Sequence, residues 1–166
     1  MMDFIADYFL GRKCNQINKN RKSFCSRTQA NSIAILYESK DQKYAEYVYQ
    51  ELFSGKKVTY FCYAEGEKCP VIAGNKILVD SKCYDLLGTL KESITSICDN
   101  SRFDIIVDLS FNKKIVFKSI LVYNTFSYRC GIKKSGYNVL DLRITGSDKN
   151  AINCLIDSII ALDKNN

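Results

Sequence analysis

The feature that most constrains the fold is an alternation of short apolar runs with helix-periodic segments. Residues 33–36 and 105–107 are uninterrupted apolar runs, a pattern typical of strands that are covered on both faces. Segments 41–55 and 81–100 carry their apolar residues at helical spacing instead. Strands and helices that alternate along a chain predict an α/β fold with a largely parallel sheet.

We therefore predict a three-layer sandwich, in which helices cover both faces of a mostly parallel sheet of about five strands. The expected strands are 32–39, 56–65, 103–109, 125–132 and 138–144, and the expected helices are 41–55, 81–100, 112–123 and a final one capped by Ser147. Residues 66–80 predict either a hairpin that turns at Gly74-Asn75 or a loop. Only five or six residues join the last two strands, too few for a helical crossover, so that pair is predicted to be antiparallel.

The N-terminal residues have a character of their own. Their apolar side chains recur at helical spacing and predict a short amphipathic helix; they are Phe4, Ile5, Tyr8 and Phe9. The polar stretch that follows lacks acidic residues and holds the basic side chains Arg12, Lys13, Lys19, Arg21, Lys22 and Arg27. We expect two parts, a basic lead-in over residues 1–31 and a single α/β domain over residues 32–166.

Composition excludes several chemistries. The 166 residues include no histidine, so Ser-His-Asp and Cys-His catalysis are impossible. The eight cysteines form no CxxC pair, which argues against a zinc site and favours reduced thiols. Because the glycines show neither GxG nor GxxxxGK[ST] spacing, no nucleotide cofactor is expected. The chain has no apolar run long enough to span a membrane and no signal-peptide pattern, which predicts a cytoplasmic protein.

The candidate site residues follow from the predicted fold. In open α/β sheets, ligands bind at the carboxyl ends of strands, where the strand order reverses. Glu38, Ser39 and Lys40 follow one predicted strand, and Asp108 and Ser110 follow another. These five residues are the predicted ligand-binding set, and Asp108 is also a candidate general base.

Structural roles are the alternative for several of these charges. Asp108 and Ser110 are placed to cap the helix that follows them, and Asp41 is placed to cap the helix after the first strand. On the last two strands, Arg129 and Asp141 are placed to form a cross-strand ion pair at an exposed sheet edge.

Two longer segments carry a resemblance. The run FDIIVDLS (103–110), the helix after it and TFSYRCGIKKSGYNVLDLRI (125–144) together resemble a family of small uncharacterised proteins of Bacteroidota, across nearly the whole chain and with no assigned activity. A stretch of about thirty residues is similar to the N-terminal half of heptosyltransferase-like glycosyltransferases. In that family a strand ending in Asp-Leu precedes a helix and then an Arg-x-Gly, and Asp108-Leu109 and Arg129-Cys130-Gly131 stand at those places. The resemblance implies a transferase, although the nucleotide-sugar site of that family lies mainly in a second domain for which this chain has no room.

Three hypotheses for function result. The first is a cytoplasmic, non-catalytic domain that binds a protein partner or a small ligand, without a cofactor or a metal. The second is a transferase-type enzyme that uses Asp108 as its base. The third is salt-dependent association with nucleic acid or an anionic membrane through residues 12–27, for which the alternative is a solvated basic arm.

Overall fold

The computed structural model describes residues 2–17, 24–64 and 75–164. Its strands are β1 (Ser32–Glu38), β2 (Lys57–Tyr63), β3 (Asn75–Val79), β4 (Ile105–Asp108), β5 (Tyr128–Ile132) and β6 (Leu142–Ile144). Its α-helices are α1 (Met2–Ile17), α2 (Gln42–Leu52), α3 (Glu92–Ser101), α4 (Ile115–Tyr123) and α5 (Lys149–Lys164). Two short 3-10 helices, η2 (Ser39–Asp41) and η3 (Ser81–Cys83), follow β1 and β3.

The six strands form one sheet in the order β3-β2-β1-β4-β5-β6, and every neighbouring pair is parallel. Leu36 of β1 pairs with Phe61 of β2 on one side and with Asp108 of β4 on the other. From β1 the chain first builds outward through β2 and β3, and then returns to add β4 beside β1. The reversal of strand order therefore lies between β1 and β4, as in doubly wound folds.

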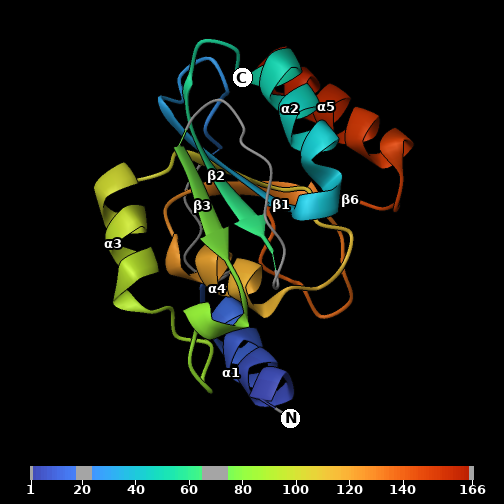
Figure 1. The fold of residues 1–166 in the computed structure, drawn as a ribbon. Helices are drawn as coiled ribbons and strands as arrows, with labels where there is room; N and C mark the ends of the chain where they lie inside the picture. Colours follow the sequence, from blue (N-terminus) through green and yellow to red (C-terminus); the bar gives the residue numbers. More distant parts are fainter. Residues whose placement is uncertain (1, 18–23, 65–74, 165–166) are drawn as a thin grey trace.

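Helices cover both faces of this sheet (Figure 1). On one face, α2 and α5 pack over alternate strand residues that include Ile35, Tyr60 and Val107. On the other face, the core contains residues of α1, α3 and α4 together with the intervening strand residues such as Phe61 and Ile106. Strands β1, β2 and β4 thus place their odd and even side chains in different cores, which explains their continuous apolar runs. The predicted α/β fold is confirmed.

Two details of the predicted sheet are wrong. The sheet has six strands rather than about five, because Asn75–Val79 adds to β2 as a parallel edge strand. The last pair, β5 and β6, is parallel rather than antiparallel. Residues 133–141 connect β5 to the parallel strand β6 without a helix. An extended chain gains about 3.3 Å per residue, so this connection is long enough to run back along the five-residue strand β5. Tyr137, Val139 and Leu140 of this connection are buried, so it takes the place of a helix in the core.

The predicted helix 81–100 is correct only in its second half, since α3 begins at Glu92. Gly88 has φ +74°, which a helix cannot contain, and a Cβ at this position would lie 2.6 Å from the Cγ of Leu10. The glycine therefore ends any helix and lets α1 approach closely. As a consequence Leu86 and Leu87, which were expected on the apolar face of the helix, are exposed. Of the predicted hairpin, residues 66–74 lie outside the described residues, and β3 pairs with β2 in parallel.

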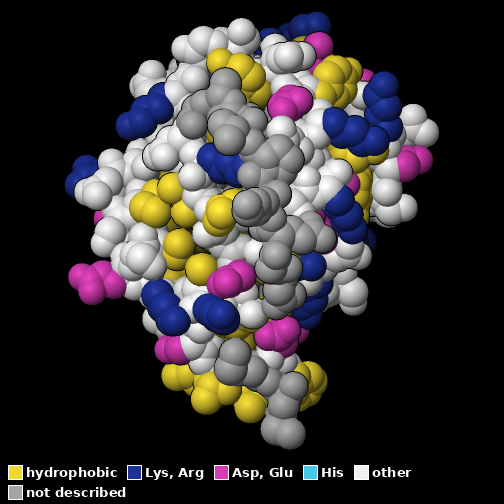
Figure 2. Space-filling model, viewed as in Figure 1, with side chains coloured by type: hydrophobic (Ala, Val, Ile, Leu, Met, Phe, Trp, Pro, Cys, Tyr) yellow, Lys and Arg dark blue, Asp and Glu magenta, His cyan; other side chains and the backbone are white. Residues whose placement is uncertain are grey.

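The buried face of helix α1 is not the apolar stripe that its sequence predicts. Ala6, Leu10 and Cys14 are buried against α4, whereas Phe4 and Tyr8 of the apolar stripe are exposed. Figure 2 shows hydrophobic side chains gathered at the lower end of the molecule, over α1. The ion pair between Asp7 and Lys118, at 2.7 Å, fixes this rotation because Lys118 is itself buried on α4.

The remaining predictions concern cysteines, a helix cap and membrane spans. Of the seven cysteines within the described residues, six are free thiols and Cys62 is disulfide-bonded, so the expectation of reduced thiols is wrong for Cys62. The final helix is capped by Asp148, which accepts the N–H groups of Asn150 and Ala151, rather than by Ser147. Within the described residues, no helix has the length and apolar character needed to cross a bilayer.

Candidate functional site

The strand reversal brings the two halves of the predicted site together. β1 ends at Glu38 and β4 ends at Asp108, and these neighbouring strands are in register, with Asp108 opposite Leu36. Glu38, Ser39 and Lys40 therefore leave the sheet beside Asp108 and Ser110, although about seventy residues separate the two groups along the chain. We call this place the switch point.

Glu38 is the centre of the contacts at the switch point. Its Oε1 accepts hydrogen bonds from the backbone N–H and the side-chain amide of Asn112, at 3.4 and 3.1 Å. Its Oε2 lies 3.6 Å from the Nζ of Lys40 and 3.3 Å from the Nζ of Lys114. Lys114 also lies over the ring of Tyr63, 4.2 Å from its centroid. One carboxylate oxygen thus faces two ammonium groups, those of Lys40 and Lys114.

The start of α2 contributes two buried oxygen atoms to the same region. Neither Oδ2 of Asp41 nor Oε1 of Gln42 has a hydrogen-bond partner among the described residues. Asp41 occupies the N-cap position of α2, but its side chain makes no capping bond, so that predicted role is wrong. Burial raises the pKa of Asp41 above its ordinary value, and the Glu38 carboxylate adds to this, while Lys40 offsets part of it.

Asp108 is sealed inside the protein. The residue is 0% exposed, and its Oδ1 accepts the backbone N–H of Ser110 at 3.0 Å and the Ser110 hydroxyl at 2.6 Å. Its Oδ2 pairs with Lys134 at 2.9 Å. Neither Asp108 nor Ser110 caps α4, which begins only at Ile115. The carboxylate is held as the acceptor of a local turn and a buried ion pair.

Sequence reasoning did not identify the residues that hold Asp108. Lys134 lies in the β5–β6 connection, where its Nζ also donates to the Ile132 carbonyl at 3.1 Å and lies 4.7 Å from the centre of the Tyr137 ring. Gly131 lets β5 come close, because a Cβ there would be 2.3 Å from the carbonyl oxygen of Asp108. The available signal was a glycine inside a predicted strand, which often marks a close backbone approach.

Three of the six basic residues predicted to form a patch, Arg12, Lys13 and Arg27, lie within the described part of the chain. Arg12 and Lys13 are exposed on α1, whereas Lys19, Arg21 and Lys22 lie outside the described residues. Arg27 is half-buried and bound to Asp163, with 2.6 Å between Nε and Oδ2. Its backbone N–H also donates to Asp163, so Arg27 joins the polar stretch to α5.

The predicted pair of Arg129 and Asp141 exists, but it is not at an exposed edge. Arg129 is 1% exposed, and its Nε and Nη2 lie 3.3 and 3.5 Å from the two oxygens of Asp141. The backbone N–H of Arg129 donates to the same carboxylate at 2.8 Å. Asp141 precedes β6, so the pair ties β5 to the connection in the interior.

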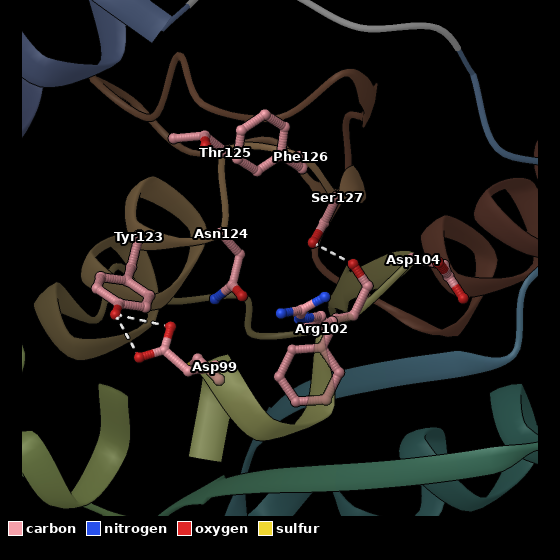
Figure 3. Close-up of a pocket in the computed structure, with 10 residues that line it drawn as sticks. Asp99, Arg102, Asp104, Tyr123, Asn124, Thr125, Phe126 and Ser127 are labelled. Carbon is pink, nitrogen blue, oxygen red and sulfur yellow. Dashed lines mark hydrogen bonds between the residues drawn. The ribbon is translucent and has the colours of Figure 1, made fainter. Parts of the chain in front are cut away.

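A separate hollow of about 730 Å³ lies at the opposite, amino-terminal edge of the sheet (Figure 3). It opens where α3 and α4 end and β4 and β5 begin. Its lining residues are Cys98, Asp99, Arg102, Phe103, Asp104, Tyr123, Asn124, Thr125, Phe126 and Ser127. None of the five predicted ligand-binding residues lines it. The part of the chain that the structure describes holds no group of His, Cys, Asp and Glu side chains suited to a metal.

Fold and switch point together define the class of the protein, a doubly wound α/β domain with a Rossmann-like parallel sheet. The chain belongs to a family of unknown function, DUF6913, whose model matches residues 3–160. This agrees with the resemblance to an uncharacterised family. No curated protein and no solved structure matches the chain.

Proposed function

We propose that this protein is a non-catalytic binding domain, and that the switch point takes a small anionic ligand that carries a carboxylate or phosphate group. The observation that carries the proposal is the pair of ammonium groups, Lys40 and Lys114, that share one carboxylate oxygen of Glu38. The side chain of Lys40 is 60% exposed and lies 3.6 Å from Glu38, so an anion can approach it from the solvent side.

The two helices that begin at this edge support an anionic ligand. Neither α2 nor α4 has a side-chain hydrogen bond at its N-cap, which is Asp41 in one helix and Lys114 in the other. The first backbone N–H groups of a helix need acceptors, and the helix dipole favours negative charge there. Asp41 adds a carboxylate at this edge, and the positive charges of Lys40 and Lys43 offset part of its effect.

The surroundings of Asp108 support a binding role over a catalytic one. A general base must come within hydrogen-bonding reach of the proton that it removes. Asp108 is fully buried and holds three hydrogen bonds from Ser110 and Lys134. Its proposed role is to fix the ends of β4 and β5, which keeps the loop that carries Asn112 and Lys114 in place.

The test is a titration of the 15N-labelled protein with inorganic phosphate at constant ionic strength, followed by amide chemical shifts. We expect the largest shifts at the first residues of α2 and α4, and an affinity at least fivefold weaker in the Lys40→Met variant. Loss of one charge-assisted hydrogen bond corresponds to a change of about this size.

The matched control is Lys57→Met, which removes an exposed lysine at the start of β2, on the opposite edge of the sheet. This variant should bind phosphate like the unmodified protein. Shifts that are spread over all exposed lysines, or an equal loss in both variants, would refute the proposal.

A further inference from the structure

The hollow at the amino-terminal edge has walls of two kinds. Phe126 is 79% exposed and Tyr123 is 41% exposed, and both come from the end of α4 and the loop after it. The polar lining includes Asp99, Arg102 and Asn124. A volume of about 730 Å³ falls within the range of small-molecule sites, which typically combine aromatic walls with a few polar groups.

Arg102 is placed in this hollow by an unusual backbone. Its φ is +44°, which makes it the only non-glycine residue with positive φ among the described residues. Its N–H donates to the Cys98 carbonyl and so ends α3, a position that glycine or asparagine usually occupies. An arginine here costs more backbone strain than glycine does, and strain of this kind often accompanies a functional side chain.

The guanidinium of Arg102 is available to a ligand. Among the described residues it takes part in neither a hydrogen bond nor an ion pair, although Asp99 and Asp104 line the same hollow. Asp104 accepts the backbone N–H groups of Asn31 and Ser32 instead, at 2.8 and 3.0 Å. Asp99 accepts the Tyr123 hydroxyl on both of its oxygens, at 2.9 and 3.0 Å.

The charges of the described residues indicate the class of ligand. Among the described residues that line the hollow, two carboxylates oppose one guanidinium, and the C-termini of α3 and α4 add partial negative charge. These groups disfavour a phosphate or carboxylate group at this edge, in contrast to the switch point. A neutral ligand with N–H donors suits Asp99, and a flat ring suits the planar guanidinium and the exposed phenyl ring.

Figure 3 shows how these groups are arranged. The Phe126 ring lies across the hollow from the Arg102 guanidinium, and the side chain of Asn124 extends down one side of the hollow to a place beside the guanidinium. The pair of Asp99 and Tyr123 stands further along that side. Since the Nδ2 of Asn124 donates to the Ile120 carbonyl at 2.8 Å, its Oδ1 is the atom left to accept from a ligand.

From this arrangement we infer that the hollow binds a planar nitrogen heterocycle, as in a nucleobase, stacked between Arg102 and Phe126. Asn124 and Asp99 accept hydrogen bonds from the N–H groups at the edge of the ring. Guanine, which carries adjacent ring and exocyclic N–H donors on one edge, fits this acceptor pair. The inference is independent of the switch point, because the two sites lie at opposite edges of the sheet.

Guanosine is the probe, with its 5′-monophosphate and a short single-stranded oligonucleotide as further arms. Binding is measured by saturation-transfer difference and amide chemical shifts at constant ionic strength. We expect shifts at residues 99–104 and 123–127, and weaker binding of the monophosphate than of guanosine. The oligonucleotide should bind no more tightly than guanosine, since its backbone phosphates meet the same negative edge.

Two variants separate a ligand site from a merely structural one. Arg102→Gly removes the guanidinium but relieves the positive φ, so it should weaken guanosine binding at least tenfold while the melting temperature stays equal or rises. Phe126→Ser should weaken binding similarly, whereas Phe4→Ser, which removes a phenylalanine of the same 79% exposure on α1, should leave it unchanged. The inference fails if guanosine does not bind, if these variants bind it normally, or if the monophosphate binds more tightly.

Discussion

The ion pair between Asp108 and Lys134 gives the sharpest test of how the switch point is held. The Asp108→Asn variant keeps the size of the side chain but removes its charge. Lys134, whose side chain is 4% exposed, then loses its counter-charge, and among the described residues it keeps the Ile132 carbonyl and the Tyr137 ring beside its ammonium group. Removing one partner of a buried pair costs about 3–5 kcal/mol.

An independent bound on this cost comes from proton release. A lysine without a counter-charge can become neutral, which costs about 4.6 kcal/mol at pH 7 for an ordinary lysine. We therefore expect Asp108→Asn to lower the free energy of unfolding by about 3–4.5 kcal/mol. The Lys134→Met variant should lose less, about 2–3 kcal/mol, because Ser110 still donates two hydrogen bonds to the remaining carboxylate.

The double variant Asp108→Asn, Lys134→Met contains neither buried charge. It should be more stable than the Asp108→Asn variant, because an apolar group replaces the unpaired ammonium. Urea denaturation measures all four proteins. With a slope of about 2 kcal/mol/M, the loss in Asp108→Asn corresponds to a midpoint lower by roughly 2 M. A loss below about 1 kcal/mol, or additive effects in the double variant, would show that the pair is not held as described.

Three further variants, one of them with a matched control, test buried ion pairs and close packing elsewhere in the fold. Asp141→Ala leaves the buried guanidinium of Arg129 with the Leu121 carbonyl, at 3.4 Å, as its one hydrogen-bond partner among the described residues. It should therefore cost about 3–5 kcal/mol and lower the melting temperature by roughly 6–20 °C in calorimetry. Gly131→Ala forces β4 and β5 apart and should cost about 1–3 kcal/mol or more in urea denaturation, whereas Gly55→Ala, where a Cβ has open space, should be limited to its backbone strain. Burial raises the pKa of Asp7, but hydrogen bonds from Lys113 and Lys118 outweigh it and hold the pKa below 3.8. The ionised Asp7 therefore stabilises the folded protein above pH 3.8, and this stabilisation is lost as the pH falls below that value. The difference in unfolding free energy between wild type and Asp7→Asn should accordingly shrink in acid. A difference that stays constant with pH would contradict this.

The switch point shows how far local sequence rules reach. Because the carboxyl ends of parallel strands share one edge, the run that ends at Glu38 and the run that ends at Asp108 were sufficient to place both groups there. The partners of these residues were not predictable in the same way. Lys114 and Lys134 are two of many lysines in the chain, and only the path of the connections sets them against Glu38 and Asp108.

The hollow at the other edge gave no sequence signal. Arg102 follows a predicted helix and Phe126 begins a predicted strand, and both residue types are ordinary at such positions. Their meeting depends on two helices that end at the same edge, and the positive φ of Arg102 is a backbone property that its side chain does not encode.

Periodicity determined most of the strands and helices, though not β3 or the start of α3, because a residue's spacing to its neighbours fixes which faces a regular element can bury. It did not determine which face of α1 is buried, whether β6 runs parallel to β5, or whether Asp108 meets solvent. Those outcomes depend on contacts between distant segments, such as Leu10 with Gly88, Asp7 with Lys118 and Lys134 with Asp108. The interior must be closely packed, and each buried charge must be paired, so these contacts have to form together in one arrangement of the elements. Only the tertiary structure shows which arrangement that is.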